Sequence, residues 1–262
     1  MKVKVFKLRG KTFRERIVSL KENIVTKMTM GILRPFNRHR MVQLDHVRED
    51  PENPIVFLGN HAEIYGPIAS ALCMPVDVRF WVINMMMFDK KVVRPYLYEN
   101  TFSKKTYLPV FIRKLLAWYL GWLSVNVMNS LRAIAVYRDS PMKLRQTLRE
   151  SVEALENGEN LMIFPEHPEG KYEKGGVSEF SPGFLMLAEA WWKKSGKKLR
   201  IMPVYANREE RTFTFGNEIT YEPENGFASE SERVLKEARD QMLNMAGLGR
   251  SEERRVGKEC YS

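Results

Sequence analysis

The stretch AIAVYRDSPMKLRQTLRESVEALENGENLMIF, residues 133–164, indicates the class of fold of this chain. It opens with a short apolar run of the kind that forms a buried strand, and Ser140-Pro141 then supplies a typical N-cap and first helical residue. Leu and Val recur every three or four residues as far as Gly158, which marks a helix end. A second apolar run follows at Leu161–Phe164. The stretch therefore predicts a strand, a helix and a further strand.

Other segments of the chain repeat this alternation of strand and helix. Residues 54–58 read as a strand that leads into Gly59, Asn60 and His61. Strands interleaved with helices predict an α/β fold, in which helices flank a central, mostly parallel or mixed sheet. The remaining predicted elements are a helix over 180–192, a strand over 200–205, strands over 212–215 and 219–221 with a Gly216-Asn217 turn between them, and an amphipathic helix over 230–246.

Composition restricts the classes of protein to which the chain can belong. With 262 residues, 44% of them hydrophobic, it is long enough to bury one large core and does not have the composition of a disordered or collagen-like chain. Cys73 and Cys260 are too few for a disulfide framework, and Lys rather than an apolar segment follows Met1. We therefore expect a cytosolic, reducing environment.

The positive charge is concentrated at the N-terminal end. The first 44 residues hold twelve Lys or Arg against Glu15 and Glu22, which accounts for the whole net charge of +10. A basic segment of this kind binds anionic surfaces, and charge alone leaves both phospholipid headgroups and nucleic acid open as partners. Because no nucleic-acid-binding motif accompanies the charge, we expect an anionic membrane surface and no nucleic acid.

Two segments have patterns that suit the surface of a membrane. From Phe13 an apolar stripe with helical spacing runs through Ile17, Leu20, Ile24, Met28 and Ile32, with basic residues on the other faces. Such a helix either lies in a bilayer interface or packs on its own domain. No run is long enough to span a bilayer, but Trp118, Tyr119 and Trp122 fit either shallow insertion or a buried helix.

Asn60-His61 is the first candidate for chemistry. It follows a predicted strand and precedes a helix start rich in small residues, so ligands can reach the imidazole, which is suited to general base catalysis. The alternative is a structural histidine. Arg138, Glu166 and Pro203 lie at or near other strand ends, and ligands of open α/β sheets gather beyond such ends. Arg138 either binds a phosphate with its planar fork or forms a surface ion pair.

Taken together, these segments resemble a known family. Asn60-His61, Arg138, Phe164-Pro165-Glu166 and Pro203-Val204 are similar in order and spacing to the four sequence blocks of the glycerolipid acyltransferases, including the 1-acylglycerol-3-phosphate acyltransferases. The resemblance covers roughly residues 50–220. It implies that family's fold, no cofactor, and transfer of a fatty acyl group from acyl-CoA or acyl-carrier protein to a lysophospholipid hydroxyl. It also implies a peripheral or monotopic enzyme on the cytoplasmic face of the cell membrane.

The resemblance also suggests a role for each matching residue. It makes His61 the general base and Arg138 the ligand of the acceptor phosphate, while Glu166 shapes the acceptor site and Pro203 forms a supporting turn. The residues expected to bind substrate are Asn60, Arg138, Phe164, Pro165, Glu166, Gly170 and Pro203.

Two positions depart from the family pattern. The first block of the family is H-x4-D, but Gly66 stands where the Asp is expected, and a carboxylate there orients the imidazole. Glu63 is the nearest substitute, although it is equally suited to capping the helix start. After Glu166, His167-Pro168 replaces the usual Gly-Thr, so the loop that follows must differ in shape. The alternative function is an impaired relative that binds lysolipid or membrane without turnover.

The predicted domain organisation has three parts. Residues 1–48 form a basic amphipathic arm that associates with membranes, and residues 49–248 form the acyltransferase domain. Residues 249–262 have no apolar periodicity and are expected to be a disordered, non-native tail.

Overall fold

The computed structural model describes residues 24–48, 50–62, 65–87, 89–103, 105, 107–137, 140–166 and 177–247. The chain divides into two compact units. The helical unit comprises Met1–Leu33 and Arg79–Glu150, and the sheet unit comprises Arg34–Val78 and Ser151–Ser262. Residues 34–48 of the predicted arm thus fall in the sheet unit, while residues 1–23 and the predicted tail lie outside the described residues.

The sheet unit is built on a mixed sheet. Its strands lie in the order β1-β7-β6-β2-β5, and β8 also pairs with β6. β2 is parallel to both β5 and β6, β1 is parallel to β7, and β7 and β8 are antiparallel to β6. The strands are β1 (Arg40–Val42), β2 (Ile55–Gly59), β5 (Asn160–Ile163), β6 (Arg200–Asn207), β7 (Thr212–Phe215) and β8 (Ile219–Thr220).

β2 is the central strand of this sheet. Its five residues are all buried, and Phe57 lies opposite Met162 of β5 and Met202 of β6. A parallel strand covered on both faces needs an unbroken apolar run rather than an alternating one, which is the pattern that the sequence has here. The predicted α/β class with a mixed sheet is confirmed.

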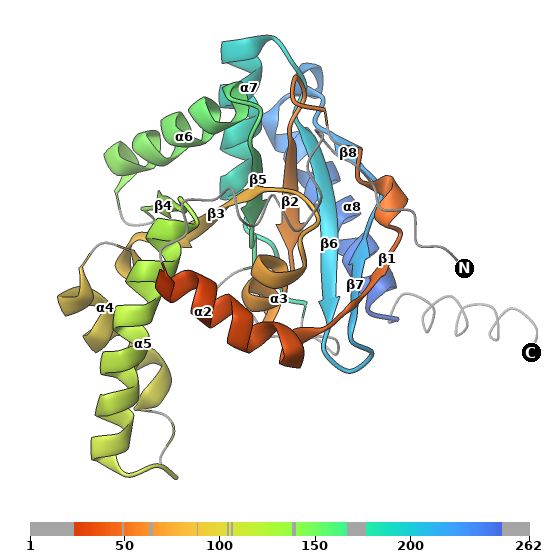
Figure 1. Cartoon of the computed structure of the whole chain (residues 1–262). Coiled ribbons are helices and arrows are strands. Elements are labelled where there is room, and N and C mark those ends of the chain that lie inside the picture. Colours follow the sequence, from red (N-terminus) through yellow and green to blue (C-terminus); the bar gives the residue numbers. More distant parts are fainter. Residues whose placement is uncertain are drawn as a thin grey trace, which may run out of the picture. The chain divides into compact units, whose positions relative to one another are not determined.

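In the described part of the chain, the α-helices that lie wholly within the sheet unit are α3 (Tyr65–Cys73), α7 (Met186–Ser195) and α8 (Phe227–Met245). In Figure 1, α3 lies in front of β2 and β6, and α8 lies behind β6. α8 buries Val234, Ala238 and Met242, which are spaced by four residues and form one stripe. The predicted helix over 230–246 is therefore confirmed and begins three residues earlier.

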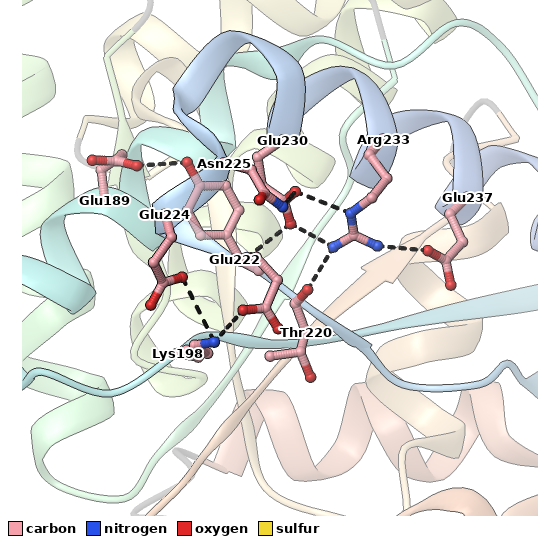
Figure 2. Close-up of polar contacts among 10 residues, drawn as sticks. Glu189, Lys198, Thr220, Glu222, Glu224, Asn225, Glu230, Arg233 and Glu237 are labelled. Carbon is pink, nitrogen blue, oxygen red and sulfur yellow. Dashed lines mark hydrogen bonds and ion pairs between the residues drawn. The ribbon is translucent and has the colours of Figure 1, made fainter.

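A network of polar contacts joins the start of α8 to β8 and to the loop after it (Figure 2). The Glu230 carboxylate, 1% exposed, accepts hydrogen bonds from the backbone N–H of Glu222, from Asn225 and from the Arg233 guanidinium. Arg233 also donates to the carbonyl oxygen of Thr220 at 2.6 Å. These contacts attach α8 to the edge of the sheet and satisfy a carboxylate that burial alone would destabilise.

The helical unit contains helices and a pair of strands. β3 (Val78–Ile83) and β4 (Ile134–Val136) are parallel, with Trp81 opposite Ile134. α5 packs against both α2 and α4. The helices are α2 (Ile24–Leu33), α4 (Lys90–Leu97) and α5 (Val110–Ser130), with a π-helical segment at Tyr98–Phe102. α6 (Pro141–Glu156) begins in this unit, and its residues from Ser151 onward belong to the sheet unit.

The start and end signals predicted around α6 are confirmed. The Ser140 hydroxyl accepts the backbone N–H of Lys143 at 3.4 Å, as an N-cap does. Gly158 ends the helix with φ 72°, and a Cβ there would lie 2.7 Å from the carbonyl oxygen of Pro51. Only glycine combines that backbone conformation with so close a neighbour.

Two predicted elements are wrong in detail. β7 and β8 are both antiparallel to β6, so the Gly216-Asn217 segment connects two strands that run in the same direction and does not reverse the chain as the predicted turn would. The helix predicted over 180–192 begins only at Met186, after a 3₁₀ turn at Pro182–Leu185. Phe180 instead forms an isolated β-bridge with Glu166.

The apolar stripe of α2 is exposed. Ile24, Met28 and Ile32 are 76%, 62% and 63% exposed, so the described part of the predicted helix does not pack this stripe on its own domain. Trp118 and Tyr119 of α5 are exposed as well, and Trp122 is half-buried. Among the described residues, no helix has both the length and the hydropathy needed to cross a bilayer.

Candidate functional site

Asn60 extends the pairing of β2 and β6 beyond the end of β2. Its side chain is 1% exposed, its Nδ2 donates to the carbonyl oxygen of Ala206 at 3.2 Å, and its Oδ1 accepts the N–H of Ala206 at 2.8 Å. The amide thus takes the place of a backbone partner in the sheet. This contact fixes the position of the backbone that enters His61, while direct contact of Asn60 with a substrate stays a prediction.

His61 lies in a tight turn between β2 and α3, and its side chain is half-buried. The next residue, Ala62, has φ 41°, in the left-handed region. The carbonyl oxygens of His61 and Ala62 accept the N–H groups of Gly66 and Tyr65 at 3.1 and 3.2 Å. These bonds close the turn onto the first residues of α3, so the imidazole is carried by a constrained backbone, as a catalytic group requires.

Gly66 is required by this turn. A Cβ at position 66 would lie 1.7 Å from the carbonyl oxygen of Asn60 and 2.8 Å from its carbonyl carbon. Both atoms belong to the backbone, so no rotation of a side chain relieves the overlap. The carboxylate that the family pattern expects five residues after His61 therefore cannot be accommodated in this conformation.

Phe164 supports the His61 ring. The two rings meet edge to face, with centroids 5.7 Å apart and planes at 81°. Gly59 leaves space for this arrangement, since a Cβ there would lie 2.7 Å from Cε1 of Phe164 and 2.8 Å from Cε of Met162. The structure thus brings together His61 and Phe164, which are about a hundred residues apart in the sequence.

Glu166 is a buried carboxyl next to the His61 turn. Its side chain is 5% exposed, and Oε1 accepts the N–H of Ser178 at 3.4 Å, while Oε2 has no hydrogen bond within the described part of the chain. Burial raises the pKa of Glu166 to about 7, although the backbone N–H groups of His61, Ser178 and Ala62 act in the opposite direction. Near neutral pH this carboxyl is therefore protonated in a large fraction of molecules.

Pro203 lies inside β6, opposite Leu58 of β2, and not in a turn as predicted. Its carbonyl oxygen accepts the N–H of Gly216 at 2.8 Å. The nitrogen and carbonyl of a strand residue face the same neighbour, so the missing N–H of Pro203 faces the interval between β7 and β8. There it interrupts no strand pairing, which explains how a proline is tolerated within a central strand.

Several residues near this turn were not singled out from the sequence. Burial, followed by the charges of Glu209, Glu210 and then Glu166, raises the pKa of the Tyr205 hydroxyl to about 12. Tyr65, the first residue of α3, forms a hydrogen bond through its hydroxyl with Nε2 of His39. The Arg208 guanidinium lies 5.8 Å from the centroid of the Tyr65 ring. In the sequence, the feature that could have identified these residues as site candidates was their position near strand ends and at a helix start.

Other predicted site residues lie outside the described residues. These are Glu63, Arg138, His167 and Gly170. The approach of Arg138 to His61 therefore stays a prediction, as does the orientation of the imidazole by Glu63. Over the described ranges, no group of His, Cys, Asp and Glu side chains is arranged to hold a metal ion.

The comparisons with known proteins give a family match and a likeness to solved structures, one of which is described here. The family model described as Acyltransferase matches residues 95–207, a range that includes Arg138, Glu166 and Pro203 but begins after His61. The 1-acyl-sn-glycerophosphate (LPA) acyltransferase PlsC from Thermotoga maritima is similar at 15% identity and a TM-score of 0.44, over 90% of this chain and 84% of that one. No curated protein sequence matches the chain.

Proposed function

We propose that this chain is an acyltransferase, as the family match over residues 95–207 supports, and that it acylates the free hydroxyl of a lysophospholipid such as 1-acylglycerol 3-phosphate. The acyl donor is acyl-CoA or acyl-carrier protein. The observation that supports this proposal best is the position of His61. It stands on a constrained turn at the carboxyl end of the central strand, with Asn60 fixing the backbone and Phe164 supporting the ring.

In the proposed reaction, His61 acts as the general base. The imidazole removes the proton of the acceptor hydroxyl as the oxygen attacks the thioester carbonyl carbon. The tetrahedral intermediate then collapses, the carbon–sulfur bond breaks, and the imidazolium returns the proton to the departing thiolate. The products are the ester and the free thiol. Because a thioester is already activated, this route needs no covalent acyl-enzyme.

The imidazole needs a group that selects its reactive tautomer, and Gly66 cannot supply one. We assign this role to Glu63, which follows His61 by two residues. Arg138 is proposed to bind the acceptor phosphate, because its planar fork matches the geometry of phosphate oxygens. Glu166 is proposed to shape the acceptor site through the His61 turn.

We also propose that the enzyme works at the cytoplasmic face of the cell membrane as a peripheral or monotopic protein. The support is the basic character of the first 44 residues, which attracts anionic lipid headgroups. A lysophospholipid acceptor is itself a component of such a surface, so binding there brings the enzyme to its substrate.

The direct test is ester formation with purified protein. The full chain is incubated with 1-acylglycerol 3-phosphate and either acyl-CoA or acyl-carrier protein carrying a fatty acid, and the diacyl product is measured by mass spectrometry. We expect His61→Ala to abolish product formation. His46→Gln is the matched control, because Nδ1 of His46 instead contacts the carbonyl oxygen of Gly216 at 3.0 Å. Absence of His61-dependent product with every common lysolipid would contradict the proposal.

Gly66 favours a second candidate function, an impaired relative that binds lysolipid or membrane without turnover. The turn excludes the carboxylate that orients the histidine in the family pattern. This candidate predicts saturable binding of 1-acylglycerol 3-phosphate without any ester product. The Glu63→Gln variant distinguishes the two candidate functions. In an enzyme that uses Glu63 to orient His61, the substitution lowers kcat, whereas a binding protein has no turnover that the substitution could reduce.

A further inference from the structure

α5 exposes large apolar side chains along one face. Phe111, Leu115, Trp118 and Tyr119, called here the α5 face, are 70%, 61%, 52% and 48% exposed. Leu115 follows Phe111 by four residues, and Trp118 and Tyr119 follow Leu115 by three and four, which places all four on one side of the helix. Ala117, Gly121 and Val125 are buried on another side. Isolated exposed apolar residues are ordinary, but a stripe of four that includes three aromatic rings marks an interaction surface.

The sequence around the α5 face is rich in positive charge. Residues 89–130 contain seven Lys or Arg, and Asp89 and Glu99 are their only acidic residues. Asp89 is used locally, since its carboxylate caps α4 by accepting the N–H of Lys91 at 2.8 Å. The Arg94 guanidinium of α4 lies 4.8 Å from the centroid of the exposed Trp118 ring. An indole with a cation beside it is suited to the boundary between acyl chains and headgroups.

The charge also indicates which partner can cover this face. Residues 1–23 carry eight Lys or Arg against two Glu, and a second copy would oppose one basic surface with another, so both are repelled. An anionic lipid bilayer instead offers apolar chains for the rings and negative headgroups for the cations. α2, which contacts α5, adds the exposed apolar stripe formed by Ile24, Met28 and Ile32.

We propose that the α5 face docks on an anionic lipid bilayer. Phe111 and Leu115 enter the boundary of the acyl chains, and Trp118 and Tyr119 lie at the level of the headgroups. This inference rests on the proposed function only for the membrane location. It goes beyond that proposal by assigning the contact to a helix after β3, separate from the basic N-terminal segment.

Vesicle binding by the full chain tests the α5 face. The protein is sedimented with phosphatidylcholine vesicles that contain or lack phosphatidylglycerol. We expect binding that depends on phosphatidylglycerol, and Phe111→Ser with Leu115→Ser weakens it about tenfold or more. Phe227→Ser, which changes a 40% exposed Phe of α8, is the matched control and leaves binding unchanged. Circular dichroism checks that each variant is folded.

A second measurement tests the same proposal without relying on the Phe111→Ser, Leu115→Ser double variant. Brominated lipids quench an indole that enters the bilayer, so wild-type fluorescence falls on addition of such vesicles, and Trp118→Phe removes most of the fall. His61→Ala keeps both binding and quenching, which separates docking from catalysis. Exchanging Lys2, Lys4 and Lys7 for Gln lowers affinity without preventing quenching at saturating lipid. The proposal is overturned if the α5 variants bind and are quenched like wild type, or if they abolish a dimer detected by sedimentation velocity.

Discussion

A Cβ on residue 66 would lie 1.7 Å from the carbonyl oxygen of Asn60, so the turn that carries His61 closes only around a glycine. The local backbone conformation therefore requires Gly66, and this glycine does more than mark the absence of a catalytic Asp. The same turn is closed by the hydrogen bond from Gly66 N–H to the His61 carbonyl oxygen. Under the proposed mechanism, a residue other than 66 orients the imidazole.

Gly66→Asp is expected not to improve the enzyme, although it restores the family pattern. The new side chain overlaps backbone atoms, so we expect the free energy of unfolding to fall by about 3 kcal/mol or more, with loss of His61-dependent product. Denaturant unfolding and the acylation assay measure both effects. Gly66→Ala is the control, because it adds the overlap without the charge and is expected to destabilise similarly. A folded Gly66→Asp enzyme with higher kcat would show that the turn can open.

Asn60→Asp is expected to destabilise the sheet unit despite its nearly identical shape. The change removes the donor to the carbonyl oxygen of Ala206 and leaves a 1% exposed carboxylate beside it. Loss of this hydrogen bond together with burial of a charge predicts a decrease of about 2–4 kcal/mol in the free energy of unfolding. Asn207→Asp, in which the side chain only accepts backbone N–H groups of Glu209 and Glu210, is the matched control. Equal stability of the two variants would contradict this role of Asn60.

Glu166 is expected to make stability depend on pH near neutrality. Its pKa is about 7 in the folded chain and close to 4.5 in the unfolded chain, so the folded state binds more protons between these values. The free energy of unfolding therefore falls as pH rises through this window, by up to about 3 kcal/mol at 1.36 kcal/mol per pKa unit.

Glu166→Gln removes this titration. Relative to wild type, the variant should gain stability as pH increases from about 5 to about 8, as measured by urea unfolding at each pH. Glu179→Gln, which changes an exposed carboxyl on the same segment, provides the comparison. A constant difference between Glu166→Gln and wild type across this range would mean that the buried carboxyl does not titrate there.

Glu230 is expected to make the free energy of unfolding depend on pH in the opposite sense to Glu166, and at acidic pH. Burial opposes its ionisation, but hydrogen bonds from Arg233, from Asn225 and from the N–H of Glu222 lower its pKa to about 2 (Figure 2). A lowered pKa gives stability that is present above the unfolded value of 4.5 and is lost as pH falls toward 2. Wild type should therefore lose stability on acidification in this window.

Arg233→Met is expected to reduce that loss and to destabilise the protein at neutral pH. Removing the guanidinium leaves the buried Glu230 carboxylate without its charged partner, at about 2–4 kcal/mol. Glu237→Gln is the control, since the Arg233–Glu237 pair is 41% and 43% exposed and contributes under about 1 kcal/mol. Thermal and acid unfolding curves measure both variants. Identical acid sensitivity of Arg233→Met and wild type would exclude this linkage.

The sequence by itself determined the class of fold and many of its strands and helices, although it did not predict β1, β3 or α4. Unbroken apolar runs such as Ile55–Leu58 form strands buried on both faces, and the Ser140 cap and Gly158 bound α6, because these signals depend on neighbouring residues alone. The sequence also placed His61 at a strand-to-helix junction and identified the Gly66 departure. These are local properties, so they can be read from short segments.

Only the tertiary structure decided what surrounds those residues. The support of the His61 ring by Phe164, the raised pKa of Glu166 and the place of Pro203 beside the interval between β7 and β8 all require segments far apart in the chain. The reason for Gly66 also needed the structure, although it lies within one turn: residue type shows that a carboxylate is missing, but not that the carbonyl oxygen of Asn60 occupies its space. Burial and close contact depend on three-dimensional neighbours, which the spacing of residues along a sequence does not specify.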